Sequence, residues 1–378
     1  MADAKDKPSL VLGIMSGTSM DAVDYCLCEV GPARVRLLRH WQVKFPPPLR
    51  RRLHAAASNQ AASYELGQLH HDLGRFYAKH SVPGPRAVKP RLVGLHGQTT
   101  FHNPDRARPA TFQLGEPAYL AEALRAPVVS NFRAADIAAG GQGAPLATLF
   151  HQIVFGKPGR HICINNLGGI SNVTSLDWRR GRTARVLAFD TGPGNMLLDL
   201  AARHFSGGQQ TCDRSGNRAA RGKVAPEILA NWLKHPFFRE RPPKSTGREL
   251  FGEPFFESAI RRMSNLSPDD ALATLTELTA RSLALNYRLH LPSLPGEVIL
   301  CGGGTANRHL VGRIRANLQT LEPSMNIRKS EELGWPRQSV EPAAFALLAY
   351  HRWRRKAGNL PETTGARRAV LLGQIAEA

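Results

Sequence analysis

The chain carries the same arrangement of residues twice, and this repeat constrains the fold more than any other feature. In the first half, the apolar run 10–15 is followed by the corner Gly17-Thr18-Ser19 and a second apolar run over 23–30. In the second half, the run 161–165 leads into a corner at 166–169 and a returning run over 170–176. Short apolar runs bounded by turn residues are typical of buried strands. We therefore predict an α/β protein of two duplicated lobes, with the two corners facing each other across a central cleft.

Further apolar runs extend both lobes. The first is predicted to continue as strand, helix, strand, helix and strand, over 35–45, 66–76, 92–95, 117–124 and 127–130. The second is predicted to contain helices at 146–153, 269–289 and from 342, and further strands at 185–189 and 297–301. We place the lobes at 9–135, joined by 355–378, and at 136–354. A glycine-rich joint is expected at 140–143 and a surface excursion or lid at 207–250.

Composition agrees with a globular protein of this size. The chain has 378 residues, of which 42% are hydrophobic and 21% charged, which fits two domains and excludes a disordered or collagen-like chain. The longest apolar run, 342–350, is far shorter than the ~20 residues of a membrane span. The first residues lack the apolar stretch of a secretory signal. We expect a cytoplasmic protein with no membrane partner.

The charge is strongly positive, with 50 Lys and Arg against 30 Asp and Glu. The arginines are scattered, and the two tight basic clusters, at 50–52 and 352–356, have no aromatic stacking platform beside them. We interpret these clusters as solvated helix faces and expect no nucleic-acid partner. The charge favours anionic ligands such as nucleotides and acidic sugars. The five cysteines form no C-x-x-C pair, so zinc and disulfides are disfavoured.

Three glycine corners point to a nucleotide. Besides the corners at 17–19 and 168–169, Gly302-Gly303-Gly304 follows the predicted strand 297–301. Glycine lacks the Cβ that keeps backbone N–H groups away from a phosphate. One such corner is typical of a hairpin turn, but three favour a nucleotide. Neither G-x-x-x-x-G-K-[ST] nor G-x-G-x-x-G is present, so two opposed hairpins would have to hold the phosphates.

Asp190 is the strongest candidate for a catalytic carboxylate. It stands where the run 187–189 ends and the turn 192–194 begins, so its side chain is expected at the edge of the cleft. It could instead cap the following helix, although Asn195 is better placed for that role. Asp-Thr-Gly also resembles the aspartic-protease motif, but such enzymes need two carboxylates that share a proton. The chain has a single Asp-Thr-Gly, which disfavours a protease.

Three further residues have both a functional and a structural interpretation. Asp21 could hold Mg²⁺ through water or stabilise its corner. Glu341 could act in the site or favour a helix N-terminus. Arg133 could bind a substrate carboxylate with both arms of its guanidinium. Position alone decides none of the three.

These segments together resemble the anhydro-N-acetylmuramic acid kinase family, bacterial cell-wall recycling enzymes of the actin/sugar-kinase/Hsp70 superfamily. The resemblance covers nearly the whole chain and is carried by 13–21, 96–99, 140–146, 166–170, 189–195, 243–251, 301–304, 358–361 and 364–366. It implies two actin-like (RNase H-like) lobes, each a mixed five-stranded sheet flanked by helices, around a central cleft.

The resemblance also implies site residues. It assigns Asp190 as the catalytic base and Thr99, Arg133 and Glu341 as sugar contacts. The ATP-binding residues it implies are Gly17, Thr18, Ser19, Met20, Asp21, Ala22, Val23, Asp24, Asn166, Gly168 and Gly169, with Gly302, Gly303 and Gly304 on the adenosine side. Ala22 departs from the glycine usual in the family, and would strain the corner if that position needs a positive φ.

The implied reaction uses ATP and Mg²⁺ to convert 1,6-anhydro-N-acetylmuramate into N-acetylmuramate 6-phosphate and ADP, in peptidoglycan recycling and amino-sugar catabolism. Water activated by Asp190 would attack carbon 1, and the freed oxygen 6 would accept the phosphoryl group. A homodimer is expected because relatives form one. Two alternatives stay open: a conventional sugar kinase of the same fold acting on a free hydroxyl, and a non-enzymatic actin-like nucleotide switch.

Overall fold

The computed structural model describes residues 8–17, 19–82, 84, 88–104, 107–179, 181 and 184–378. They form two compact units. The first unit runs up to Phe155 and takes in Gln338–Ala378, and the second is Gly156–Arg337.

The first unit is built on a seven-stranded sheet. Its strands are β1 (Ser9–Ser16), β2 (Ala22–Gly31), β3 (Arg34–Lys44), β4 (Leu92–Asn103), β5 (Ala110–Leu114), β6 (Val128–Ser130) and β12 (Gln374–Ala376). They lie in the order β12-β6-β4-β1-β2-β3, with β5 paired to β4. β1, β2 and β3 are antiparallel neighbours, whereas β4 runs parallel to β1, and β6 parallel to β4.

The second unit repeats this core. Its five strands are β7 (His161–Leu167), β8 (Ile170–Asp177), β9 (Arg185–Pro193), β10 (Glu297–Cys301) and β11 (Asn326–Lys329), in the order β11-β10-β7-β8-β9. Again the first three are antiparallel neighbours, and the last two run parallel to the first. The predicted duplicated α/β architecture is confirmed. The first unit adds β5 and β12 to the expected five strands.

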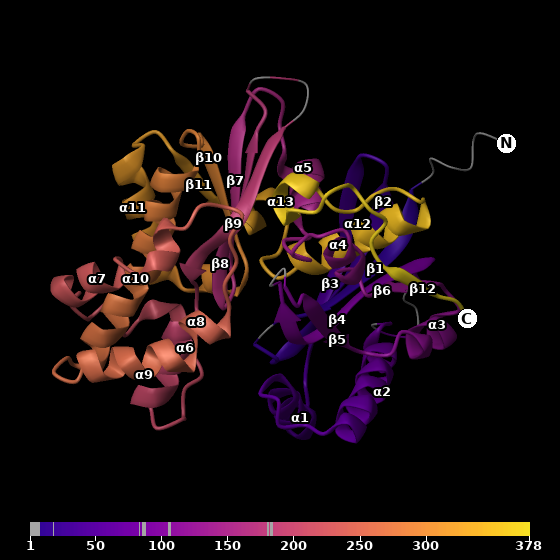
Figure 1. Ribbon diagram of the computed structural model, residues 1–378, viewed down its shortest axis with the longest axis horizontal. Coiled ribbons are helices and arrows are strands. Elements are labelled where there is room, and N and C mark those ends of the chain that lie inside the picture. The colour runs from indigo at the N-terminus through magenta and orange to yellow at the C-terminus, as the bar shows by residue number, and fades with distance from the viewer. Residues whose placement is uncertain are drawn as a thin grey trace. The chain divides into compact units, whose positions relative to one another are not determined.

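Two glycines let a helix lie directly on the first sheet. Gly13 and Gly94 are register partners on β1 and β4. A Cβ on Gly13 would lie 1.8 Å from the carbonyl oxygen of Pro342, and one on Gly94 would lie 2.2 Å from that of Phe345. Helix α12 (Val340–Trp353) therefore packs backbone to backbone on β1, β2 and β4 (Figure 1). Leu12, Ile14, Val93 and Leu95 pack instead in a core with α1 (Pro47–Ala57), α2 (Ser63–His80) and α3 (Ala118–Leu124).

A buried carboxylate joins the end of the chain to its middle. Asp136, in α4 (Ala134–Ala138), accepts hydrogen bonds from Gly143 N at 2.8 Å and from Asn359 Nδ2 and Thr364 Oγ1 at 2.7 Å each. The segment 140–143 is thus anchored inside the first unit, before α5 (Thr148–Phe155) and beside α13 (Pro361–Thr364). Our interpretation of 140–143 as the joint between the lobes was wrong, because a short glycine run reveals conformational freedom but not its hydrogen-bond partners.

The compact units divide the chain elsewhere than expected. We placed residues 136–155 and 338–354 in the second lobe, whereas both belong to the first unit. The reason for the second difference is the contact of α12 with β1, β2 and β4, which a pattern of apolar residues along one helix does not reveal.

The second unit surrounds its sheet with helices. They are α6 (Met196–Phe205), α7 (Pro226–Trp232), α8 (Arg248–Phe251), α9 (Glu253–Arg262), α10 (Pro268–His290) and α11 (Arg308–Leu321), with short turns η1 (Arg214–Gly216), η2 (Pro236–Arg239), η3 (Gly303–Ala306) and η4 (Ser330–Leu333). The segment 207–250, expected as a surface excursion or lid, includes core residues: Trp232, Phe237 and Phe238 are buried. Phe238 stacks on Phe251 with ring centroids 5.6 Å apart.

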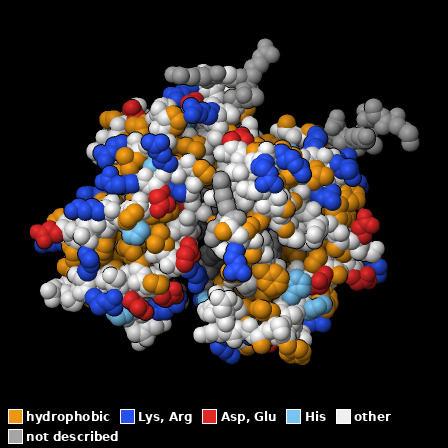
Figure 2. Space-filling view, viewed as in Figure 1, with side chains coloured by type: hydrophobic (Ala, Val, Ile, Leu, Met, Phe, Trp, Pro, Cys, Tyr) orange, Lys and Arg blue, Asp and Glu red, His pale blue; other side chains and the backbone are white. Residues whose placement is uncertain are grey.

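The distribution of basic side chains on the surface agrees with the scattered arginines of the sequence. Lys and Arg side chains are dispersed among neutral and apolar ones on the face shown in Figure 2. Within the described part of the chain, no helix combines the length and the apolar character needed to cross a bilayer.

Candidate active site

The second corner is built from two turns that lie against each other. Gly194 N donates to the Gly169 carbonyl at 2.9 Å, and Asn195 N donates to the Gly168 carbonyl at 2.8 Å. A Cβ on Gly194 would lie 2.3 Å from the Gly168 carbonyl oxygen, so only glycine allows this approach. The turn that follows β9 thereby supports the hairpin between β7 and β8.

The third corner packs on the second. Gly302 has φ +84°, and a Cβ there would lie 2.2 Å from Asn166 Oδ1. A Cβ on Gly304 would lie 2.7 Å from that of Leu167, whereas no described atom lies within 4 Å of a Cβ on Gly303. The structure thus brings the corners at 166–169 and 302–304 together, with the Gly303 position open to a ligand.

Asn195 stands at the N-cap position of α6, as predicted, and also joins these turns. Its backbone carbonyl accepts a hydrogen bond from Asp199 N at 2.8 Å, whereas its side chain makes no capping hydrogen bond. Instead, its Nδ2 donates to the Leu167 carbonyl at 3.2 Å.

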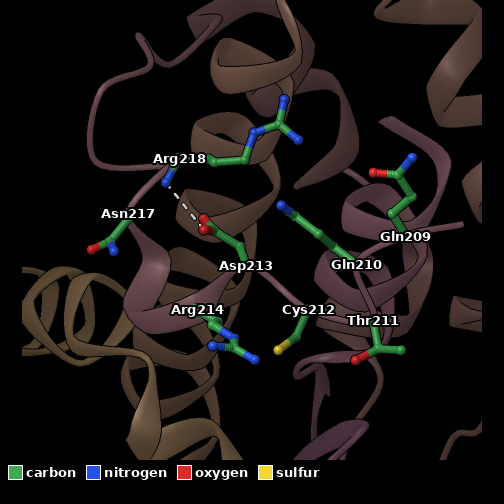
Figure 3. A pocket seen from close by; sticks show the side chains of 8 residues that line it. All are labelled: Gln209, Gln210, Thr211, Cys212, Asp213, Arg214, Asn217 and Arg218. Carbon is green, nitrogen blue, oxygen red and sulfur yellow. Dashed lines mark hydrogen bonds between the residues drawn. The ribbon is translucent and has the colours of Figure 1, made fainter. Parts of the chain in front are cut away.

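A cavity of about 450 Å³ lies in the second unit beside η1 (Figure 3). Its lining comes from one stretch, Gln209–Asp213 with Arg214, Asn217 and Arg218. Asp213 accepts hydrogen bonds from the backbone N–H groups of Arg218 and Ala219 at 3.0 and 2.9 Å, which fixes the turn. Gly216 packs on Asn307, which directly follows η3. The polar lining and the volume suit a ligand of nucleoside size.

Asp190 lies half-buried in β9 with one oxygen already bound. Its Oδ2 accepts a hydrogen bond from Thr246 N at 2.8 Å, and its own backbone N–H donates to the Lys244 carbonyl at 3.1 Å. Burial and, to a smaller extent, Glu249 raise the pKa of Asp190 to about 7 against the opposing effects of the Thr246 N–H and Lys244. Oδ1 has no hydrogen-bond partner among the described residues. A carboxyl poised near neutrality with one free oxygen is suited to take a proton.

The first corner, between β1 and β2, is open at Gly17 and fixed behind it. No described atom lies within 4 Å of a Cβ on Gly17. Its carbonyl accepts hydrogen bonds from Met20 N at 3.1 Å and Gln98 Nε2 at 3.2 Å. Thr18 lies outside the described residues, and Ser19 is exposed. Met20 has φ +56°, so among the described residues of this corner Met20 takes the left-handed conformation.

The strain expected at Ala22 is therefore absent. Ala22 begins β2 and pairs with Lys44, where an extended backbone accommodates any residue. Val23 is buried, and Asp24 binds His40 Nε2 at 2.9 Å. Asp21 Oδ1 pairs with Arg50 Nη2 at 2.5 Å.

Arg133 and Glu341 belong to one charged cluster in the first unit. Arg133 donates to the Gly143 carbonyl at 2.7 Å and, through Nη2, to His96 Nε2 at 2.9 Å. Burial lowers the pKa of Arg133 to about 10, while Glu341 and Asp136 oppose the fall. Burial and, to a smaller extent, Asp24 raise the pKa of Glu341 to about 7 against the opposing effect of Arg133. The structure thus groups Arg133, Glu341 and Asp24.

His96 was missed as part of this cluster. An arginine only donates, so His96 Nε2 must accept and the ring proton lies on Nδ1, which donates to the Gly97 carbonyl at 2.8 Å. Burial and Arg133 hold the pKa of His96 well below its usual value. Its place in the segment 96–99, which carries part of the family resemblance, was the available signal. Thr99, also on β4, is half-buried and accepts from Gln113 Nε2 at 3.4 Å.

Lys244 and Thr246 were missed as well. Both lie within 243–251, which the family resemblance included without assigning roles. The predicted site residues divide between the two units. The first unit contains the described residues of the corner 17–24 with Thr99, Arg133 and Glu341. The second contains Asp190 and the other two corners.

Two units with one shared strand order, each with a glycine-bearing hairpin between its first two strands, define a duplicated α/β fold. The family model "Anhydro-N-acetylmuramic acid kinase" matches residues 9–378. The chain belongs to this family.

The chain is also similar to curated relatives and to solved structures. It is 41% identical to an anhydro-N-acetylmuramic acid kinase of Microcystis aeruginosa, over 97% of this chain and 99% of the relative. It is 40% identical to that of a Cyanothece species, over 97% and 98%. Among solved structures, it is similar to the activator of 2-hydroxyisocaproyl-CoA dehydratase from Clostridium difficile with bound ADPNP, at 13% identity and a TM-score of 0.44, over 92% of this chain and 96% of that one.

Proposed function

We propose that this chain is an ATP-dependent kinase of 1,6-anhydro-N-acetylmuramate that opens the anhydro ring with water and phosphorylates oxygen 6. The products are N-acetylmuramate 6-phosphate and ADP, so the enzyme serves cell-wall recycling and amino-sugar catabolism. Family membership supports the substrate. The observation that carries the mechanism is Asp190, a half-buried carboxyl with one bound and one unbound oxygen.

The substrate requires a base and a phosphate donor together. Its oxygen 6 is bonded to carbon 1, so no free hydroxyl is available to attack ATP. Water attacks carbon 1 and gives a proton to Asp190, while the bond between carbon 1 and oxygen 6 breaks. The electron pair left on oxygen 6 forms the new bond to the γ-phosphorus, and ADP leaves. One water is consumed, and the proton passes from Asp190 to solvent after turnover.

Asp190 is oriented for one of its oxygens to act. Because Oδ2 accepts from Thr246 N, the lone pairs of Oδ1 are those available to the attacking water. A pKa of about 7 matches a general base that works near neutral pH. Thr246 Oγ1 is buried without a hydrogen-bond partner in the described part of the chain, and we infer that this hydroxyl meets the water or the sugar when substrate is bound.

The glycine corners are proposed to bind the nucleotide. Gly17 and Gly303 are open at the Cβ position, which leaves room for phosphate oxygens to approach the backbone at Gly17 and for the adenosine side of the nucleotide at Gly303. Gly216, between the cavity-lining residues Arg214 and Asn217, packs on Asn307 just after the third corner, which supports the adenosine side of the assignment. Asn166, Gly168 and Gly169 remain assigned to the phosphates, as do residues 17–24.

Mg²⁺ is proposed to arrive with ATP. Among the described residues, no three His, Cys, Asp or Glu side chains are grouped so as to hold a metal ion. Mg²⁺ keeps several waters and is commonly bound by substrate phosphates with few protein ligands. Asp21 remains our candidate for a contact to Mg²⁺ through water. For this contact, its carboxylate would have to release Arg50, with which it forms an ion pair. When bound, the ion neutralises phosphate charge.

The cluster in the first unit is proposed to bind the sugar. The remaining donor capacity of Arg133 fits the lactyl carboxylate of the muramate, and Thr99 and Glu341 offer hydrogen-bonding groups to the ring substituents. His96 positions Arg133 through the two contacts to its Nε2, at 2.9 and 3.2 Å.

The Asp190→Asn variant tests the proposal. It keeps an acceptor for Thr246 N but cannot take a proton, so turnover should fall by at least about 10²-fold while ATP still binds. Asp177→Asn, at the other end of the neighbouring strand β8, serves as the control and should retain activity. Full activity in Asp190→Asn removes the residue from the role of base.

Isotope labelling separates ring opening from simple phosphoryl transfer. In ¹⁸O-water, ring opening by water places label at carbon 1 of the product, whereas a conventional sugar kinase acting on a free hydroxyl incorporates none. Filaments formed with ATP and without sugar turnover would favour the nucleotide switch. A homodimer and a cytoplasmic location also remain proposals, and sedimentation of the purified protein tests the first.

A further inference from the structure

The segment 244–246 holds Asp190 at two points. Lys244 O accepts from Asp190 N at 3.1 Å, and Thr246 N donates to Asp190 Oδ2 at 2.8 Å. The segment has no regular secondary structure of its own. Its geometry must therefore be fixed by side chains, and we call it the Asp190 strap.

The side chain that anchors the strap is a buried lysine. Lys244 is only 6% exposed. Its Nζ donates to the Phe237 carbonyl at 2.8 Å and lies 4.5 Å from the ring centroid of Phe237 and 5.9 Å from that of Phe189. Phe189 directly precedes Asp190, so the ammonium contacts the strand that carries the carboxylate as well as η2.

The Lys244 ammonium has few hydrogen-bond partners, so its charge depends on nearby carboxylates for stabilisation. His290 Nε2, on α10, lies 3.4 Å from Lys244 Nζ and also 3.1 Å from the Phe238 carbonyl, and its one Nε2 site serves either contact but not both. The charged groups facing Lys244 are Asp190 on β9 and Glu240, which directly follows η2. Those facing Asp190 are Lys244 and Glu249. A buried ammonium is retained at low cost only beside such opposite charge.

We propose that Lys244 is a positioning residue for Asp190: it fixes the strap that binds Oδ2, and its charge favours the ionised carboxylate that accepts the proton. This inference rests on the proposed function of Asp190 as the base. A methionine or leucine would fill the same apolar surroundings of Phe189 and Phe237, so packing alone does not account for a lysine here. Burial lowers the pKa of Lys244 to about 8, and Glu240 and Asp190 oppose the fall.

The test compares Lys244→Met with Lys244→Arg. Met keeps the volume and removes the charge, so the acidic limb of kcat/KM against pH should move to higher pH, and kcat should fall more than the KM for ATP changes. Arg keeps the charge and should leave the limb near its wild-type position. A folded Lys244→Met enzyme with an unmoved acidic limb overturns the proposal.

A second measurement covers the case in which Lys244→Met does not fold. Coupling between two titrating groups is reciprocal, so Asp190→Asn should lower the pKa of Lys244. NMR of enzyme labelled with ¹⁵N-lysine measures this pKa. An unchanged Lys244 titration overturns the inference. Failure of the proposed function gives a different result: Asp190→Asn then retains turnover, whatever the titration of Lys244.

Discussion

At the scale of single residues, two half-buried carboxyls distinguish this protein. Burial raises the pKa of both Asp190 and Glu341 to about 7. Each unit contains one of them. Both residues therefore change charge near neutral pH, and catalysis and stability should respond to the same titrations.

The pH profile should show Asp190 directly. The base must be ionised, so kcat/KM for the anhydro sugar should fall about tenfold per pH unit below about pH 7. The measurement is initial rate across pH with saturating ATP. An acidic limb at the ordinary aspartate value, near pH 4, would contradict the raised pKa as the source of the profile.

Glu341→Gln should affect stability in a pH-dependent way. A carboxyl whose folded pKa lies above its unfolded value stabilises the protein fully below the unfolded pKa, and this contribution is lost as pH rises to about 7. At about pH 8 the variant should therefore be at least as stable as wild type, with less advantage at about pH 5. Thermal unfolding at both pH values measures this. A variant that is clearly less stable at the higher pH would contradict the argument.

Cys212 offers a reporter for the cavity beside η1. It is exposed and lines that cavity, whereas the other four cysteines are buried. Burial and the nearby Asp199 raise its pKa, so it should react with a maleimide more slowly than a free thiol. Saturating ATP should slow the reaction further. Cys212→Ser should abolish rapid labelling, and an unchanged rate with ATP would place the nucleoside elsewhere.

At the scale of elements, the glycines of the third corner have different roles. Gly302 has φ +84°, and a Cβ at this residue would lie 2.2 Å from Asn166 Oδ1, while the space at Gly303 is open. Gly302 is needed for the packing of the corner on Asn166, and we propose that the open space at Gly303 gives the nucleotide access to the backbone. One substitution at each separates stability from binding.

Gly302→Ala should destabilise the second unit by about 1–3 kcal/mol, since it adds both strain and a clash. Gly303→Ala should change the unfolding free energy by no more than about 0.5 kcal/mol but raise the KM for ATP by about tenfold, because the methyl group obstructs the adenosine side of the nucleotide. Urea unfolding and steady-state kinetics measure the two effects. Equal stability losses would refute the distinction.

The elements also show what sequence could and could not predict. The strands that bear corners were predicted because apolar runs and glycines are local signals. Short or polar strands such as β5 and β12 were not predicted, because they form only through pairing with β4 and β6, which are distant in the sequence or carry no local signal for it. At the site, Asp190 and the corners carry local signatures, and the roles assigned to them remain predictions. Lys244 and His96 were missed because their function depends on contacts with residues distant in the sequence.

At the scale of the whole molecule, the end of the chain is tied to its middle through Asp136. Thr364 Oγ1 donates to this buried carboxylate across 228 residues of sequence. Thr364→Val should cost about 1.5–3 kcal/mol, since it removes a hydrogen bond to a charged group. Thr363→Val, which loses bonds to the Leu360 carbonyl and to Thr148 Oγ1 but none to a carboxylate, should cost about 1 kcal/mol. Equal losses in denaturant unfolding would remove Asp136 from its anchoring role.

The matching strand order of the two sheets has an evolutionary consequence. Descent from one ancestral gene segment would leave two copies of every loop position, so selection can specialise one copy while its counterpart keeps the older task. The end of β4, with His96 and Thr99, and the end of β10, with Gly302, are such counterparts. New substrate preferences in related enzymes should therefore arise by change at the former while the latter stays constant.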